Sequence, residues 1–480
     1  MTSNSSTPRA GRPAQSRRTR HATVHLVPDS LGFALDQAAQ AVGAVRCGSA
    51  LPAALASLQA ALPAGIAAVS RGAAQDIAYR TMRRLGTVDW LIRQRVSKAP
   101  SPLVANLLAC SLALLVDGEA AYAPFTVVDQ AVKAVGARRE SAFAKGLVNA
   151  VLRSFLRERD ALLAAAQADE VARWNYPQWW IDSVRSAWPD DWQAVLEAGN
   201  GHGPLTLRVN ARRSSVEAWL ARLADEGIAA ARIGEDAVRL AEPMPVERIP
   251  GFAAGDVSVQ DAGAQRAARL LGARDGMRVL DACAAPGGKT CHLLELADLD
   301  LVALESDAGR AKRIDENLAR LGLAARVVVG DAGEPSAWHD GEPFDRILAD
   351  VPCSASGIVR RHPDIRWLRR ASDLTALAAT QQRILDALWP LLKPGGELLY
   401  VTCSIFPEEG ELQASRFERS RPDAVRLDAP GQLLPTAGGA PVGVPAGGAT
   451  DCGAAEGASP GPERTALDYD GFFYARFQKR

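Results

Sequence analysis

Apolar and polar positions follow three different rhythms along this chain, and each predicts a different kind of structure. Over residues 29–166, apolar residues recur at three- and four-residue spacing, as at Val104, Leu107, Leu108 and Leu112. That spacing places them on one face of a helix. Prolines between such segments separate successive helices. The first part is therefore predicted to be an all-α bundle of five to seven helices.

The pattern changes over residues 167–254, which combine a tryptophan-rich helix with shorter alternating stretches. The tryptophans of this helix are Trp174, Trp179, Trp180, Trp188 and Trp192. Residues 205–210 alternate as a strand does, and residues 216–225 show helical spacing. We expect a linker helix followed by a small α+β subdomain.

From residue 255 to residue 480, short apolar runs alternate with helical stretches. Helices are predicted over 307–321 and 373–393, the second ending at the stop signal Lys393-Pro-Gly-Gly. Strands are predicted over 278–282, 301–304, 326–329, 344–349 and 397–401, with a last one over 471–477. Strands that alternate with helices form a parallel, doubly wound α/β sheet.

Two stretches follow none of these rhythms. Residues 1–28 are rich in Ser, Thr, Pro and Arg, and we expect a disordered basic tail, or one that adds non-specific attraction to nucleic acid. Residues 438–466 are rich in Gly, Ala and Pro and are expected to be a flexible insertion of the last domain.

Composition narrows the class of protein. Lys and Arg (55) balance Asp and Glu (55), which argues against an extended positive coat but not against local basic patches. No apolar run is long enough to cross a membrane, and the first residues lack the apolar core of a secretory signal. Seven scattered cysteines form no Cys-x-x-Cys pair, so we expect a reduced cytoplasmic protein without a metal.

The turn after the first predicted strand of the last domain, Asp281-Ala-Cys-Ala-Ala-Pro-Gly-Gly-Lys-Thr290, suggests a ligand site. A phosphate-binding Walker loop would need glycine where Cys283 stands, and a G-x-G-x-x-G dinucleotide fingerprint is absent. We favour an adenosyl ligand without phosphates, which the backbone approaches closely at Gly287 and Gly288.

Two acids support this interpretation, because each stands at the carboxyl end of a predicted strand. Glu305 ends the second strand, where a carboxylate can accept hydrogen bonds from ribose hydroxyls. Asp331 follows the third strand and could accept from the exocyclic amine of adenine. Either acid alone could equally be a solvated loop carboxylate.

Two cysteines also follow strands of this sheet, in Asp350-Val-Pro-Cys353-Ser and Thr402-Cys403-Ser. A thiolate that adds to carbon 6 of a pyrimidine makes carbon 5 able to attack a sulfonium methyl group. A carboxylate near ring nitrogen 3 stabilises the charge that appears there, and a second thiol can assist release. The residues alone leave open which cysteine attacks.

Together these motifs resemble the signatures of the RNA 5-methylcytosine methyltransferases of the NOL/NOP/Sun family. The resemblance implies a Rossmann-like class I methyltransferase domain with S-adenosylmethionine as cofactor. It implies that Cys403 is the nucleophile, that Cys353 assists product release, and that Asp350 serves both catalysis and cofactor binding. The implied cofactor contacts are Cys283, Ala284, Ala285, Pro286, Gly287, Gly288, Lys289, Glu305, Asp331 and Asp350. Many members have aspartate where this chain has Glu305.

The helical part narrows the resemblance to one bacterial group. Residues 146–153 resemble the NusB-like RNA-binding domain that precedes the catalytic domain in that group, and residues 358–367 and Pro407-Glu408-Glu409 are also similar to it. This implies methylation of one cytosine of unassembled or partly assembled 16S rRNA by a monomeric enzyme. A tRNA cytosine-C5 methyltransferase and a non-catalytic ribosome-assembly factor that binds RNA remain as alternatives.

Two groups of arginines are candidate RNA contacts. A loop beside Cys353 is expected to bind phosphates and stack a base, the alternative being a solvated charged face. Its residues are Arg360, Arg361, Arg366, Trp367, Arg369 and Arg370. The second group lies in the helical part, where ordinary surface charge is the alternative. Its residues are Arg71, Arg80, Arg83, Arg84, Arg138 and Arg139.

Overall fold

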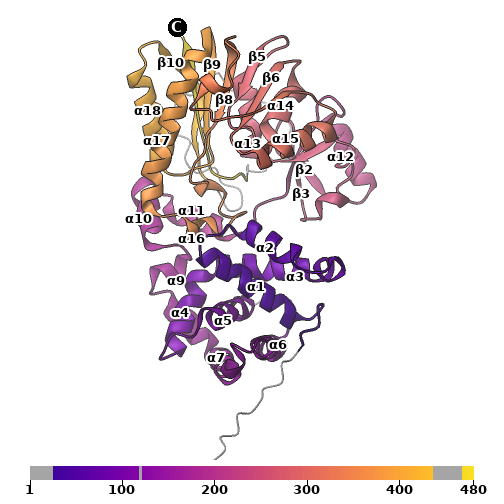
Figure 1. The fold of residues 1–480 in the computed structure, drawn as a ribbon, viewed down its shortest axis with the longest axis vertical. Coiled ribbons are helices and arrows are strands. Elements are labelled where there is room, and N and C mark those ends of the chain that lie inside the picture. Colours follow the sequence, from indigo (N-terminus) through magenta and orange to yellow (C-terminus); the bar gives the residue numbers. More distant parts are fainter. Residues whose placement is uncertain (1–24, 118–121, 436–467) are drawn as a thin grey trace, which may run out of the picture.

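The structure is a computed structural model that describes residues 25–117, 122–435 and 468–480. Residues 1–24 of the predicted basic tail and the whole predicted insertion 438–466 lie outside the described residues. Figure 1 shows a helical part and a part built around sheets, one at each end of the long axis. The predicted combination of an all-α bundle, a small α+β subdomain and a Rossmann-like α/β domain is confirmed.

The described residues of the helical part form eight α-helices, so the predicted five to seven were too few. Short helices divided by a single turn account for the difference, since α8 begins two residues after α7 ends. The eight are α1 (Leu31–Arg46), α2 (Leu51–Ala60), α3 (Ala64–Arg83), α4 (Leu85–Arg95), α5 (Pro102–Val116), α6 (Pro124–Ala137), α7 (Lys145–Arg157) and α8 (Arg159–Ala166).

The fifth helix is the centre of this bundle. Leu108 and Leu112 of α5 are fully buried, and α5 packs against α1, α3, α4, α6 and α7. Ser111 is also buried, and its hydroxyl is satisfied by donating to the carbonyl of Leu107 at 2.8 Å. The apolar spacing seen in the sequence is therefore the core of the helical part.

The tryptophan-rich segment forms three helices that connect the helical part to the carboxyl-end edge of the large sheet. They are α9 (Glu170–Trp174), α10 (Gln178–Ala187) and α11 (Trp192–Asn200). Trp180 is buried against Phe406, and the indole of Trp188 donates to the carbonyl of Ile405 at 2.9 Å. These aromatic side chains pack the linker helices against a loop that follows a strand of the large sheet.

The small subdomain is a four-stranded antiparallel sheet of order β2-β3-β1-β4 with one helix. Strand β1 (Thr206–Val209) and helix α12 (Val216–Asp225) match the predicted elements, and buried Trp219 packs α12 on the sheet. The prediction missed the other three strands, β2 (Ala230–Arg232), β3 (Ala237–Leu240) and β4 (Val257–Val259). Each has only three or four residues, too few for a clear alternation.

The large sheet has the order β10-β11-β9-β8-β5-β6-β7, in which only β11 runs antiparallel to the other strands. Its strands are β5 (Arg278–Asp281), β6 (Asp300–Glu305), β7 (Arg326–Val329), β8 (Phe344–Asp350), β9 (Leu392–Thr402), β10 (Ala424–Leu433) and β11 (Phe472–Lys479). All six predicted strands are present, and β10 was missed.

Helices cover both faces of this sheet (Figure 1). Alternate residues of each strand enter two separate cores, as Leu399 does on one face and Leu398 on the other. One face is covered by α13 (Ala262–Leu271), α14 (Gly288–Leu296) and α15 (Ala308–Leu321), the other by α17 (Ala371–Leu388) and α18 (Glu411–Ser420).

The predicted end of the helix over 373–393 was wrong. Helix α17 ends at Leu388, and Lys393-Pro-Gly-Gly belongs to β9 instead. Pro390 lies in a short 3-10 turn directly after the helix, where a residue without a backbone N–H cannot continue the α-helical hydrogen bonds. The helix therefore ends before Pro390, and Lys393-Pro-Gly-Gly does not end it.

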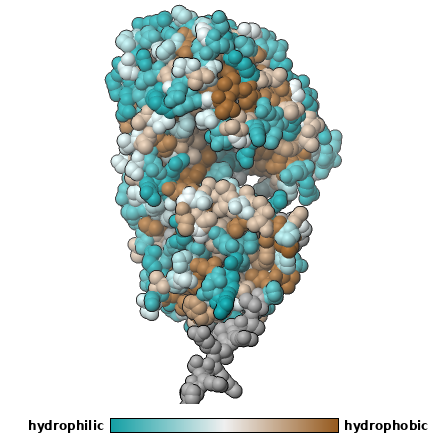
Figure 2. All heavy atoms as spheres, in the orientation of Figure 1, coloured by the Kyte–Doolittle hydropathy of each residue, from teal (hydrophilic) through white to brown (hydrophobic). Residues whose placement is uncertain are grey.

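The surface in Figure 2 is largely hydrophilic with small hydrophobic patches, and it is hollowed where the helical part meets the part that contains the sheets. Among the described residues, no helix has the length and apolar character needed to span a membrane.

Candidate active site

The sheet topology brings the predicted site residues to one edge. Strands β5, β6, β8 and β9 are parallel neighbours, so their carboxyl ends meet there. Lys289, from the turn after β5, donates to Asp350 at the end of β8, with 2.6 Å between Nζ and Oδ2. Burial acts against the charge of Lys289, but the Asp350 carboxylate outweighs it and raises the pKa of this lysine.

The two cysteines lie side by side at this edge. Cys353 follows β8, Cys403 follows β9, and their sulfur atoms are 3.4 Å apart. The hydrogen bond to Cys403, together with burial, raises the pKa of Cys353 well above its ordinary value. Cys353 is therefore a neutral thiol, and its sulfur lies within hydrogen-bond distance of the Cys403 sulfur.

A buried carboxylate connects the loops that carry the two cysteines. Glu409 is fully buried in a 3-10 turn, Pro407–Glu409. Its Oε1 accepts the backbone N–H of Ser354 at 2.7 Å, and its Oε2 accepts the hydroxyl of Ser404 at 2.6 Å. Sequence reasoning used Pro407-Glu408-Glu409 as a mark of resemblance and assigned it no role. The only signal was a carboxylate six residues after a candidate catalytic cysteine.

The turn after β5 leads into helix α14 beside the end of β6. Gly287 precedes the helix with a φ of 96°, and a side chain there would approach the Cα of Ile314 at 3.2 Å. Only glycine fits this position without strain. At Gly288 a Cβ atom would meet a single atom within 4 Å, 3.6 Å away on Gln260. The turn therefore leaves open space against its backbone.

Glu305 lies beside this turn and is almost fully buried. Its carboxylate accepts backbone N–H groups of Ala285 at 3.3 Å and Asp307 at 3.1 Å, and the guanidinium of Arg310 lies 3.4 Å away. Within the turn, the N–H of Ala284 donates to the carbonyl of Leu304 at 2.9 Å. Strand β6 and the turn are thus joined around one carboxylate.

Cys283 and Pro286 lie in the middle of this turn. Burial raises the pKa of the Cys283 thiol well above its usual range, and Asp350 and Asp281 act in the same direction. The carbonyl of Pro286 accepts the side-chain amide of Asn317 at 2.9 Å. Cys283 is therefore a neutral thiol in the part of the turn that lies closest to the acids of the site.

Asp331 follows β7 and is the most exposed of the predicted site acids. The N–H of Gly333 donates to it at 2.7 Å and Arg383 at 3.0 Å. Although its partial burial acts the other way, these two donors lower the pKa of Asp331. The carboxylate lies at the predicted strand end, but Arg383 already pairs with it.

Two of the arginines in the loop beside Cys353, which the sequence suggested as RNA contacts, are buried within the protein, while Arg370 is exposed. Arg360 and Arg366 are buried. Arg360 pairs with Asp468 at 2.6 Å and also with Asp470. Arg366 donates to the carbonyl of Gly199 at 2.6 Å and stacks on the ring of Tyr176.

Other residues of this loop also make internal contacts. Arg361 pairs with Asp261 at 2.9 Å, and the Trp367 indole donates to the carbonyl of Met82 in the helical part at 2.8 Å. Arg369 donates to the carbonyls of Cys353 and Ser354 at 3.2 and 3.0 Å. The loop joins parts of the protein, and the carboxylates it uses lie about a hundred residues away in the sequence.

The helical-domain arginines separate into two groups. Arg80, Arg83 and Arg84 line one cavity of about 480 Å³ together with His202. Arg138 instead pairs with Asp36 at 2.6 Å. Arg71 and Arg139 do not line that cavity.

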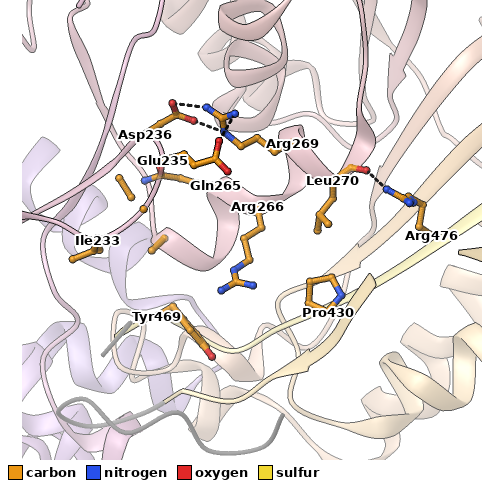
Figure 3. Close-up of a pocket in the computed structure, with 13 residues that line it drawn as sticks. Ile233, Glu235, Asp236, Gln265, Arg266, Arg269, Leu270, Pro430, Tyr469 and Arg476 are labelled. Atoms are coloured by element: carbon orange, nitrogen blue, oxygen red, sulfur yellow. Dashed lines mark hydrogen bonds and ion pairs between the residues drawn. The ribbon is translucent and has the colours of Figure 1, made fainter. Parts of the chain in front are cut away.

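A further cavity, of about 430 Å³, lies between the small subdomain, α13 and the β10–β11 pair (Figure 3). Arg266 and Tyr469 face one another across it, with the guanidinium 5.6 Å from the ring centroid. Arg269 pairs with Asp236 at its other end. None of the predicted catalytic or cofactor residues lines this cavity.

Comparison with known proteins places each part in a known family. Residues 268–478 match the model of the 16S rRNA methyltransferases RsmB/F, and residues 176–247 match the ferredoxin-like domain of RsmF/B-like methyltransferases. Residues 36–157 match the NusB family. The three matches follow one another along the chain in the order of the three structural parts.

Individual relatives agree over most of the chain. Ribosomal RNA small subunit methyltransferase B of Pseudomonas putida is 44% identical over 404 residues, which cover 82% of this chain and 90% of the relative. The protein of the same name from Cronobacter sakazakii is 41% identical over 415 residues, covering 85% and 90%. The crystal structure of PH0851 shares the fold, with a TM-score of 0.70 at 23% identity, covering 95% of this chain and all of that one.

Proposed function

Since the chain belongs to the RsmB/F family of 16S rRNA methyltransferases, we propose that it methylates carbon 5 of one cytosine in 16S rRNA through a covalent adduct on Cys403. The observation that carries this proposal is the pair of sulfur atoms 3.4 Å apart beside the Lys289–Asp350 ion pair. Only one thiol is needed to attack the base. The second thiol, so close to the first, is therefore assigned a separate catalytic step.

We assign the cofactor S-adenosylmethionine to the turn after β5. The open space against Gly288 and the buried carboxylate of Glu305 fit a ligand approached by backbone and bound through hydroxyl groups. When bound, this cofactor supplies an electrophilic methyl group. The proposed contacts are Cys283, Ala284, Ala285, Pro286, Gly287, Gly288, Lys289, Glu305, Asp331 and Asp350. Asp331 would have to share its carboxylate with Arg383.

The thiols then have separate tasks. The thiolate of Cys403 adds to carbon 6 of the cytosine, which makes carbon 5 nucleophilic. The Cys353 thiol, kept neutral by its hydrogen bond to Cys403 and by burial, lies where it can assist the later elimination. After methyl transfer, solvent water takes the proton from carbon 5, the electrons of that C–H bond form the double bond between carbons 5 and 6, and the bond between carbon 6 and the Cys403 sulfur breaks. Cys403 is thereby regenerated as a thiolate.

The ion pair beside the thiols stabilises the charge of the adduct. Addition at carbon 6 places negative charge on the ring around nitrogen 3. A buried ammonium such as Lys289, whose pKa is raised by Asp350 against the effect of burial, stays protonated and can lie opposite that charge. Asp350 orients the ammonium through the 2.6 Å hydrogen bond.

The test is to trap the adduct on a denaturing gel with labelled 16S rRNA and S-adenosylmethionine. Cys353→Ala should accumulate a protein–RNA band because release is slowed. Cys403→Ala should give neither a band nor methylated RNA, because no bond to carbon 6 can form. Cys47→Ala, at an exposed cysteine outside the site, is the matched control and should behave as the unmodified protein does.

A trapped band with Cys403→Ala and none with Cys353→Ala would exchange the two roles. Bisulfite mapping of the same RNA should find one methylated cytosine. Methylation of tRNA without methylation of 16S rRNA would overturn the proposed substrate.

A further inference from the structure

A cationic cavity lies where the helical part meets the linker helices, apart from the catalytic edge. Arg80 and Arg83 come from α3, Arg84 directly follows that helix, and His202 follows α11. Its volume is about 480 Å³, which is enough room for a phosphate group. Three guanidinium groups thus converge on one space from a single turn of the helical part.

The negative charge around this cavity does not match the positive charge. Arg84 donates to Asp117 at 3.0 Å, and Arg80 donates to Asp76 at 2.8 Å. Arg83 has no carboxylate partner among the described residues, although nine-tenths of it is buried. It donates only to the carbonyl of Arg360, at 3.0 Å, and its Nε is left without an acceptor.

Two titratable groups on different elements have lowered pKa values, caused first by burial and then by neighbouring arginines. Burial and the neighbouring Arg366 lower the pKa of Arg83 to about 10. Burial, followed by Arg83 and Arg80, lowers the pKa of His202, which faces the cavity from the linker side, while Asp76 and Asp117 act against this. An anion in the cavity would relieve both groups.

We propose that this cavity binds a phosphate group of the RNA backbone, an inference that rests on the proposed function because it takes the substrate to be RNA. Guanidinium groups donate two parallel hydrogen bonds to phosphate oxygens, and arginine is the preferred residue for such contacts. Arg84 pairs with Asp117, and Arg80 pairs with Asp76 at 2.8 Å and, more distantly, with Asp117 at 3.8 Å. Each guanidinium keeps further N–H groups for a ligand. Arg83 supplies the buried, uncompensated charge.

The position of the cavity connects this contact to catalysis. Arg83 donates to the carbonyl of Arg360, and Arg369 of the same loop donates to the carbonyls of Cys353 and Ser354. A phosphate bound at Arg83 is therefore fixed relative to the loop that carries one of the two thiols. The site would position the RNA strand so that its target base reaches the crevice.

The test compares Arg84→Gln and Arg80→Gln with Arg46→Gln. Arg46 is a matched control, because it also belongs to the helical part, is also partly exposed and also pairs with one aspartate, Asp89, at 2.6 Å. Affinity for a 16S rRNA transcript is measured by filter binding over a series of KCl concentrations. Each cavity variant should bind roughly tenfold more weakly, as expected for a lost hydrogen bond to a charged group. The slope of log K against log salt should fall by about one.

Equal losses in the control and the cavity variants would overturn the proposal, because total charge rather than the cavity would then explain binding. Unchanged RNA affinity in the cavity variants would also overturn it. Titration with inorganic phosphate, followed by the NMR signal of His202, separates the two phosphate sources. A response to phosphate with no effect of the variants on RNA would make this a free-phosphate site.

Failure of this inference differs from failure of the proposed function. Suppose that the unmodified protein methylates the RNA and the cavity variants bind RNA with unchanged affinity. The cavity proposal would then be wrong and the proposed function would stand. Suppose instead that the cavity variants bind RNA more weakly but the unmodified protein methylates no cytosine. The proposed methyltransferase function would then be wrong and the cavity proposal would stand.

Discussion

Two arginine clusters looked alike in the sequence and have opposite charge balances in the structure. In the loop beside Cys353, Arg360 and Arg361 meet three carboxylates, Asp261, Asp468 and Asp470. In the cavity of the helical part, the buried Arg83 meets none. Acid is in excess around Arg360 and Arg361, whereas positive charge is in excess around the cavity. The function of an arginine therefore depends on which acids the fold brings to it.

The titration of one group in each cluster reflects this difference. Burial and the neighbouring Asp470 raise the pKa of Asp261 to about 6, although Arg361 and Arg360 act against them. Burial and Arg366 lower the pKa of Arg83 to about 10. The surplus of acid around Arg360 and Arg361 disfavours an added anion, whereas the charge around the cavity favours one.

The largest expected effect comes from breaking the closed cluster. Arg360→Met should lower the free energy of unfolding by about 3–5 kcal/mol, because it leaves buried carboxylates without their partner. Urea denaturation followed by tryptophan fluorescence measures this. Arg46→Met removes an exposed pair and should cost less than about 1 kcal/mol. Similar costs for both variants would contradict the contrast between the clusters.

A second experiment uses pH to examine the same cluster. The pKa of Asp261 is about 6 in the folded protein against 3.8 ordinarily, so its protonation favours the folded state. That contribution is complete below pH 3.8 and is lost as pH rises through about 6. The unfolding free energy should therefore fall between these values, by up to about 3 kcal/mol, relative to that of Asp261→Asn. Parallel pH profiles for the two proteins would show that Asp261 is not the group responsible.

The smallest effect concerns the contact between the loop and the helical part. Trp367→Phe removes the hydrogen bond from the indole to the carbonyl of Met82 and keeps most of the aromatic surface. We expect a loss of about 1 kcal/mol in unfolding free energy. Trp338→Phe, which also removes an indole hydrogen bond but lies within the sheet domain, is the control for a local effect. Only Trp367→Phe should expose the helical part to earlier proteolysis.

Short-range patterns predicted the elements and the catalytic edge, because each depends on residues close together in the sequence. The turn 281–290 and the two cysteine motifs each follow a strand, and parallel pairing brings strand ends together. What could not be predicted depends on distant partners. Asp470 lies 110 residues from Arg360, and nothing in the local sequence of either shows that they meet. Strand β10 was missed for the same reason, since it is defined by its pairing with β11 across residues 436–467.

The carboxylate of Glu409 has a mechanical consequence for the crevice. Because it accepts hydrogen bonds from Ser354 and Ser404 at the same time, neither cysteine loop can shift without pulling on the other. The separation of the two sulfurs is therefore held by one carboxylate that both loops share.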